Sequence, residues 1–279
     1  MKRAAWINLA LLGAVIALVL IAWLKPSVSE PEHKLSTLKA TDAKSIRIEI
    51  AGAEPIALER AATDWRITAP FTARADSFQV QRLLGILDAT SKDRFPAVGL
   101  ARYELNEPHV RVTIERQTFS FGAANSMSNE QYVLTQDGIY PVSLRYAAAL
   151  PKNTLQLASR QLFAAEEAPV AFEFSAFKLA QEGGKWRLVP PAANPGADDI
   201  NRWVDEWRLA TALAVQAASE RKPLATIKVK LKSSGDVTLA VVQREPELII
   251  ARSDQKFEYR FPGAIARRLL APPVAGASK

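Results

Sequence analysis

The sequence contains no cysteine and only two histidines, His33 and His109, among its 279 residues. Without cysteine the chain cannot form disulfides, thiolate nucleophiles, cysteine-ligated zinc sites or iron–sulfur clusters. Neither histidine stands in a pattern of histidines and carboxylates with the spacing of a metal site. We expect His109 to be a surface or structural residue and His33 to be solvated, and we predict no metal ligand and no cofactor.

The sequence also lacks the common motifs of phosphate binding and acyl transfer. Neither Gly-x-Gly-x-x-Gly nor Gly-x-x-x-x-Gly-Lys nor Gly-x-Ser-x-Gly occurs in it. Asp198-Asp199 could act as paired carboxylates, but they stand where a predicted helix begins, and carboxylates there accept hydrogen bonds from backbone N–H groups and stabilise the helix dipole. Glu166-Glu167 are expected to be solvated. We therefore predict no catalytic residue and a protein that is not an enzyme, with a hydrolase of unrecognised site as the weakest alternative.

The charge of the chain is modest once its beginning is set aside. The formal net charge is +7, and Lys2, Arg3 and Lys25 supply three of these charges. The other basic residues alternate with acidic ones and do not form the basic, aromatic-interleaved face of a nucleic-acid binder. We expect no nucleic-acid partner. A hydrophobic content of 48% with 23% charged residues predicts a folded chain long enough for one large or two ordinary domains.

Residues 4–24 form a long apolar run in which Asn8 is the only strongly polar residue. A helix of this length is about 30 Å long, which matches the core of a bilayer. Aromatic and basic residues flank the run: Trp6, Trp23, Lys2, Arg3 and Lys25. We predict a single-pass anchor in the inner membrane of a bacterium, with the N-terminus in the cytoplasm and the body in the periplasm.

A cleaved signal peptide is the alternative interpretation of the same run. It also begins with basic residues, and Ser27-Val28-Ser29 has the small-x-small pattern of a cleavage site. Signal-peptide cores are about 7 to 15 residues long, which is shorter than this run. The uncleaved anchor is therefore the preferred prediction.

Two segments of the body share one order of features. Period-two alternation predicts strands at 46–50, 56–58 and 64–67 in the first segment, and at 172–174, 177–179 and 185–188 in the second. Asp76-Ser77 and Asp198-Asp199 are then predicted to cap helices. The apolar faces of these helices match at an offset of 120 residues: Val80, Leu83, Leu84 and Leu87, then Ile200, Trp203, Val204 and Trp207. Trp65 and Trp186 also correspond, so the body is predicted to be an internal repeat.

Each segment continues with about four strands and a short closing helix. The strands are predicted at 110–114, 119–122, 132–134 and 139–142, and at 227–231, 237–241, 248–250 and 257–261. The closing helices are predicted at 144–150 and 265–270. Four of the six tryptophans, Trp65, Trp186, Trp203 and Trp207, are expected in the core, and Arg267-Arg268 at a solvated helix end.

The predicted fold class is α+β. A transmembrane helix within residues 1–25 and a polar linker, 26–40, precede two tandem repeats, 41–168 and 169–279. Each repeat is a mostly antiparallel sheet with one packed helix, because a half-buried sheet needs a second layer to cover its apolar face.

Local motifs of the first repeat resemble a known family. They are Trp-x-Ile-x-x-Pro before a capped helix, Tyr103 to Pro108 before a strand, Phe121-Gly122, Tyr132-Val133-Leu134 and residues 159–163. Over about residues 45–165 they resemble family 4340 of the domains of unknown function, although Glu104 replaces the usual glycine and Asn106 the acidic residue. The resemblance implies an anchored periplasmic module, in relatives often linked with ABC-type export or gliding systems, and it supplies no catalytic residue.

We expect a binding or scaffolding accessory of an envelope transport or assembly complex. Residues 4–24 would contact the inner membrane, and a membrane protein, such as part of an ABC-type transport complex, would be the partner. Recognition would use sheet edges, to which a partner strand can add. The alternative is a module that binds a small molecule or glycan in the cleft between the two repeats.

Overall fold

The computed structural model describes Trp6 and residues 11–17, 19–20, 32–62, 64–191, 195–232 and 235–274. Residues 11–17 and 19–20, within the predicted anchor, are helical and exposed. Apart from Trp6, the other residues of the predicted anchor lie outside the described residues, as do residues 26–31 of the predicted linker. Among the helices of the described ranges, none combines the length and the hydropathy that crossing a membrane requires.

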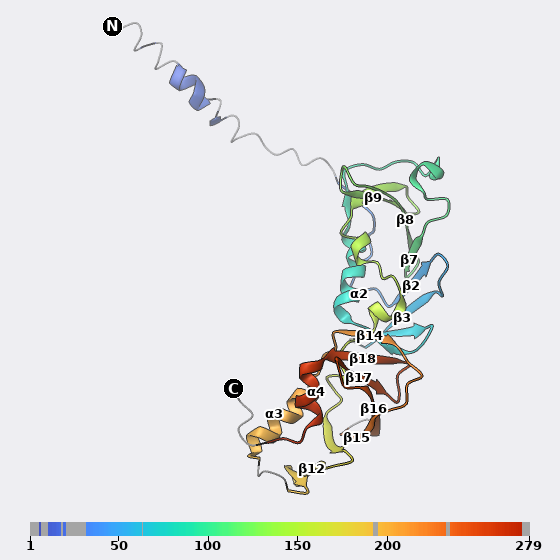
Figure 1. The fold of residues 1–279 in the computed structure, drawn as a ribbon. Coiled ribbons are helices and arrows are strands. Elements are labelled where there is room, and N and C mark those ends of the chain that lie inside the picture. The colour runs from blue at the N-terminus through green and yellow to red at the C-terminus, as the bar shows by residue number, and fades with distance from the viewer. Residues whose placement is uncertain are drawn as a thin grey trace.

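The first half of the body is an eight-stranded antiparallel sheet in the order β10-β9-β8-β7-β2-β3-β4-β5. Its strands are β2 (Ser45–Ile50), β3 (Ile56–Ala61), β4 (Asp64–Ala69), β5 (Ala73–Arg74), β7 (Val110–Ile114), β8 (Gln117–Asn125), β9 (Glu130–Leu134) and β10 (Ile139–Ser143). Helix α2 (Ser77–Leu84) lies beside this sheet (Figure 1). Short 3-10 helices follow: η1 (Gly85–Asp88), η2 (Leu100–Tyr103), η3 (Ala147–Ala149) and η4 (Thr154–Leu157).

The second half is another eight-stranded antiparallel sheet, in the order β13-β12-β11-β15-β16-β17-β18-β14. Its strands are β11 (Pro169–Glu173), β12 (Lys178–Glu182), β13 (Lys185–Val189), β14 (Ala214–Ala217), β15 (Ala225–Leu231), β16 (Gly235–Gln243), β17 (Glu247–Arg252) and β18 (Phe257–Pro262). Helices α3 (Ala197–Arg208) and α4 (Gly263–Leu270) pack beside each other and against this sheet. The two halves are stacked end to end (Figure 1).

Seven strands follow the same order in both sheets. The order β10-β9-β8-β7-β2-β3-β4 of the first sheet corresponds to β18-β17-β16-β15-β11-β12-β13 of the second. The eighth strand is added at opposite edges, because β5 extends the β4 edge whereas β14 extends the β18 edge. The α+β architecture with two large antiparallel sheets agrees with the predicted fold class, and the shared strand order is what an internal repeat requires.

The two predicted helices bury the predicted faces, and an aspartate accepts hydrogen bonds from backbone N–H groups at the start of each, as expected. Asp76 caps α2, accepting hydrogen bonds from the N–H groups of Phe78 and Gln79. Helix α3 begins at Ala197, so Asp198 and Asp199 stand where the helix begins, as predicted. Both lie in its first turn, where Asp199 Oδ2 accepts from Gly196 N at 3.1 Å and negative charge stabilises the helix dipole.

The end of the predicted linker belongs to the folded first half. Strand β1 (His33–Lys34) pairs with β6 (Thr90–Ser91), and Leu35 N donates to Ala89 O at 3.1 Å. The Leu35 side chain is buried in the core. A single buried leucine within a polar stretch carries no period-two signal, which is why residues 33–36 looked like linker in the sequence.

Three of the four predicted core tryptophans are buried, and one is not. Trp65, Trp203 and Trp207 are at most 6% exposed. Trp186 is only half-buried, because β13 is the outermost strand of its sheet among the described residues. Aromatic rings surround Trp203 in the second half: Phe172, Phe174, Phe177 and Trp207.

Candidate functional site: the junction between the two sheets

Residues 157–162, the connecting segment, link the two halves and pair first with the open edge of the first sheet. Asp76 N donates to Leu157 O at 2.7 Å, and Ser159 N donates to Arg74 O at 2.8 Å. Ala75 and Ala158 form an antiparallel bridge between these two bonds. The connecting segment therefore continues the first sheet beyond β5.

The same segment then pairs with the second half. Leu162 N donates to Ala210 O at 3.0 Å, and Ala212 N donates to Arg160 O at 2.8 Å. Residues 210–212 lead directly into β14, the edge strand of the second sheet. Because one short segment is bonded to both edges, the two sheets form a single hydrogen-bonded body.

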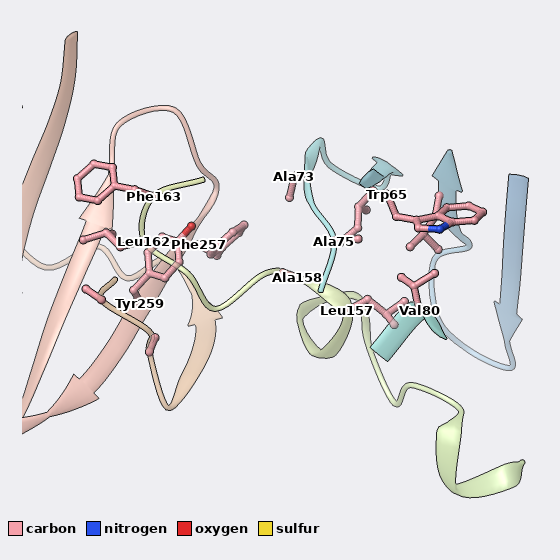
Figure 2. Close-up of a cluster of buried hydrophobic side chains, with 14 of the residues drawn as sticks. Trp65, Ala73, Ala75, Val80, Leu157, Ala158, Leu162, Phe163, Phe257 and Tyr259 are labelled. Atoms are coloured by element: carbon pink, nitrogen blue, oxygen red, sulfur yellow. The ribbon is translucent and has the colours of Figure 1, made fainter. Parts of the chain in front are cut away.

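Apolar side chains fill both ends of the junction. Figure 2 shows Leu157 and Ala158 beside Trp65 and Val80, and Leu162 and Phe163 farther along, beside Phe257 and Tyr259. These residues are all buried. The halves also touch directly, since the ring centroids of Phe71 and Phe257 are 5.9 Å apart. Burial at both ends fixes the connecting segment against each half.

Arg252 holds the second half to the connecting segment. Its side chain is 2% exposed, and its Nη1 donates to Leu162 O at 2.6 Å and to Glu167 Oε2 at 2.8 Å. Its Nη2 contacts Glu167 Oε1, and its Nε donates to Asp254 Oδ1 at 2.8 Å. The prediction that Glu167 is solvated is therefore wrong, because its carboxylate is the partner that a buried guanidinium requires. Glu166 is exposed, as expected.

Arg74 holds the same segment from the first half. Its Nη2 donates to Gln161 O at 2.7 Å and lies 3.4 Å from Leu162 O. The Leu162 carbonyl thus accepts hydrogen bonds from an arginine of each sheet. Arg160, in the connecting segment, approaches the Asp76 carboxylate of the α2 cap at 3.7 Å.

The buried carboxylates remain ionised. Burial opposes the charge of Glu167, but hydrogen bonds from Arg252 and from Ala164 N outweigh it and hold the pKa of Glu167 below its ordinary value. Burial likewise opposes the charge of Glu258, whose side chain is 1% exposed. The hydroxyl and N–H of Ser219, at 2.6 and 2.8 Å, hold its pKa below its ordinary value. Neither carboxylate is tuned toward the neutral pH at which a general acid or base would work.

Two grooves flank the connecting segment. One, of about 500 Å³, lies between β4, the start of α2 and residues 159–166, and contains three arginines and three acids: Arg66, Arg74, Arg160, Asp64, Asp76 and Glu166. The other, of about 640 Å³, lies between η4 and residues 213–217. Arg160 lines both grooves. The balanced charge of the first groove suits a neutral or zwitterionic polar molecule better than a strongly charged one.

The residues weighed in the sequence as chemical candidates do not come together. His33 and His109 are exposed, and Asp198 and Asp199 belong to the first turn of α3. Within the described ranges, no three histidine or acidic side chains are grouped as metal ligands would be. Of the charged residues that converge on the junction, Arg74 and Arg252 were not singled out in the sequence, Arg160 was named only within the motif at 159–163, and Glu167 was expected to be solvated. Arg252 alone carries a local signal, since it takes an inward position after Leu248 and Ile250.

The family comparison includes the connecting segment and part of the second half. No curated protein and no solved structure matches the chain. Residues 65–224 match the family described as Domain of unknown function (DUF4340), which is more than half of the chain. The match begins later than the expected 45–165 and continues into the second half, so it covers the connecting segment and residues 210–212. The chain therefore belongs to the DUF4340 family.

Proposed function

We propose that the chain is a membrane-tethered periplasmic protein that binds or scaffolds a partner in an envelope transport or assembly complex, and that it is not an enzyme. The observation that carries this proposal is the junction. The buried Arg252 guanidinium is engaged with the largely buried Glu167, with the exposed Asp254 and with the Leu162 carbonyl. Such an arrangement stabilises a rigid body and keeps the carboxylates ionised, which suits recognition better than proton transfer.

The tether would be the apolar run of residues 4–24, with the N-terminus in the cytoplasm. A protein held at the membrane meets other membrane proteins at a much higher effective concentration than a free one. A membrane protein, such as part of an ABC-type transport complex, is therefore the proposed partner.

The body itself is proposed to be two copies of one unit. The two halves share the order of seven strands. They also share one backbone hydrogen bond, from a leucine at the start of each half to an alanine that follows its first long helix. Leu35 N donates to Ala89 O at 3.1 Å, and Leu162 N donates to Ala210 O at 3.0 Å. Both leucines are buried, and both acceptors follow the first long helix of their half. By this correspondence the first unit begins near His33, not at residue 41.

Crosslinking in intact membranes tests the proposed function. A photo-reactive residue would be placed in the full-length chain at one exposed position in each half, Arg116 and Lys228, followed by purification and identification of the products. We expect one membrane protein to be enriched reproducibly over a full-length chain without the photo-reactive residue. Recovery of the chain alone, from both positions, would contradict the proposal. Protease treatment of spheroplasts checks the orientation, since a body shielded until lysis would contradict a periplasmic location.

The grooves of about 500 and 640 Å³ beside the connecting segment favour one second candidate, a small-molecule or glycan binder. A ligand at a hundredfold excess over its Kd stabilises the folded state by about 2.7 kcal/mol, which raises the melting temperature measurably. Thermal shift against envelope sugars, lipids and peptides would detect it. Arg160→Ala, which alters both grooves, should abolish the shift, whereas Arg116→Ala on the exposed β7–β8 turn should not.

A further inference from the structure

The edges of the two sheets are finished in different ways. The connecting segment covers β5, η4 lies against β14, and Phe95 exchanges two backbone hydrogen bonds of 2.9 Å with Ile139 of β10. Strand β13 pairs with β12 on one side. On its other side, no strand of residues 32–62, 64–191, 195–232 or 235–274 pairs with it. Within those ranges, the outer side of β13 is therefore open to another strand.

The first sheet shows how an added strand buries the edge that corresponds to β13. Strand β4 takes the same place in the strand order, and β5 and then the connecting segment cover it. Trp65 of β4 is 6% exposed, whereas Trp186 of β13 is half-buried. A strand added beside β13 would complete the burial of Trp186 as the first half completes that of Trp65.

The hairpin fixes which backbone groups of β13 point outward. Gly183 and Gly184 have φ of 57° and 81°, so they form a two-residue turn that makes Glu182 and Lys185 a hydrogen-bonded pair. Hydrogen-bonded and non-hydrogen-bonded pairs alternate along an antiparallel ladder. The N–H and C=O groups of Trp186 and Leu188 therefore point away from β12, toward any added strand.

The side chains of β13 define the chemistry of that strand. Lys185 and Arg187 are exposed on the solvent face, and Arg187 shares only a largely exposed ion pair of 3.2 Å with Glu182. Trp186 and Leu188 lie on the opposite, core-facing side. Cross-strand neighbours of opposite charge attract each other, and like charges repel. Basic edge residues therefore deter a basic strand and favour an acidic one.

We propose that β13 is the docking edge for an extended partner segment whose residues alternate between acidic and apolar. The acidic residues would lie opposite Lys185 and Arg187, and the apolar ones would cover Trp186 and Leu188. This inference rests on the proposed function and names the surface that the partner uses.

Amide hydrogen exchange on the full-length chain in mild detergent tests the docking edge. The probe is a synthetic peptide of about ten residues that alternates glutamate and valine, with a lysine–valine peptide as its control. We expect the glutamate peptide to slow exchange of the Trp186 and Leu188 amides at least about tenfold, because it pairs with them. The lysine peptide should have no effect. Protection of these amides without any peptide would overturn the proposal.

Two matched double variants distinguish strand addition at the β13 edge from attraction of the peptide to the charged face of the sheet. Lys185→Glu with Arg187→Glu reverses the edge charges, and Lys228→Glu with Lys230→Glu reverses two exposed charges on the same face of β15, a central strand. We expect the first pair to weaken glutamate-peptide binding about tenfold and the second less than about twofold. Equal losses would show attraction to the sheet face as a whole and would overturn strand addition at β13.

This experiment and the crosslinking experiment can fail independently. If a membrane partner is crosslinked but the peptide leaves β13 unprotected, the docking edge is wrong and the proposed function stands. If the peptide protects β13 but no membrane partner is found, the proposed function is wrong.

Discussion

The two halves share a strand order but differ in what they bury. Among the described residues, the buried polar side chains of the first half are serine hydroxyls, whereas the second half buries Arg252 and Glu258. The first half also closes its β4 edge with its own chain, and the second leaves β13 open within the described ranges. The same strand order is therefore compatible with a core of apolar side chains and serine hydroxyls in one half and with buried charged side chains in the other.

The largest expected effect concerns the buried charges of the second half. Arg252→Met would leave the Glu167 carboxylate buried without its partner, so we expect the free energy of unfolding to fall by about 3 to 5 kcal/mol. Arg111→Met in the first half breaks a pair with Glu49 whose side chains are 44% and 40% exposed, and it should cost less than about 1 kcal/mol. Urea unfolding of both variants measures the difference. Equal losses of unfolding free energy would show that the buried charge pair of the second half is no more important for stability than an exposed pair of the first.

The two corresponding tryptophans provide the next comparison. Trp65→Ala should destabilise the fold by about 3 to 5 kcal/mol, because it empties a fully packed site. Trp186→Ala should cost less than about 2 kcal/mol, since part of the ring already contacts water. Denaturant unfolding monitored by circular dichroism distinguishes them. A loss at Trp186 as large as that at Trp65 would mean that the β13 edge is covered in solution.

Close packing in the first half is tested at Gly122. A methyl group there would lie 2.2 Å from the Tyr103 carbonyl oxygen and 2.7 Å from a Leu105 side-chain carbon, so Gly122→Ala should cost about 1 to 3 kcal/mol. Gly85 has φ of −56° and nothing within 4 Å of the added methyl group. Gly85→Ala should therefore be neutral or stabilise by up to about 1 kcal/mol. Melting temperatures that move in the same direction would contradict this account.

The buried carboxylate of the second half predicts a dependence on pH. The folded-state pKa of Glu258 lies below its ordinary value of 4.5. The ionised carboxylate therefore adds to the free energy of unfolding above about pH 4.5, and this stabilisation is lost as the pH falls through the lower folded-state pKa. Glu258→Gln should cost roughly 1 kcal/mol at neutral pH and flatten the acid dependence of stability. Urea unfolding at a series of pH values checks both. An unchanged slope below pH 4.5 would rule out Glu258 as its source.

The smallest effect concerns a family motif in the first half. Glu104, where the family resemblance leads one to expect glycine, has φ of 56°, which is unfavourable for a residue with a side chain. Glu104→Gly should therefore stabilise the protein by about 0.5 to 1 kcal/mol in thermal unfolding. Glu107→Gly, at an exposed position without positive φ, should not stabilise it.

The elements that could be predicted from the sequence are those in which apolar residues recur at a regular spacing. Strands β2, β4, β7 and β15 alternate between buried and more exposed residues, because one face of each sheet is buried, and the faces of α2 and α3 repeat at helical spacing. Strands β1, β5 and β6 have two residues each and β14 has four, which is too short for a period. The β5 and β14 edges and the junction between them consist of such short elements and irregular chain, so their pairing was not predicted.

The charged groups of the junction were missed for a different reason. Glu167 and Arg252 are 85 residues apart, and no local pattern connects them. Glu167 follows another glutamate in a polar stretch, which is typical of solvated sequence. Only the inward position of Arg252 after Leu248 and Ile250 suggests a buried charge, and it does not identify the partner.

Residues 157–162 have a practical consequence for dissecting the molecule. Cutting the chain within them would leave unpaired backbone groups on both sides of the cut. Fragments that divide the protein there should be poorly soluble, whereas two overlapping fragments that each retain these residues would keep the bonding partners of their own sheet.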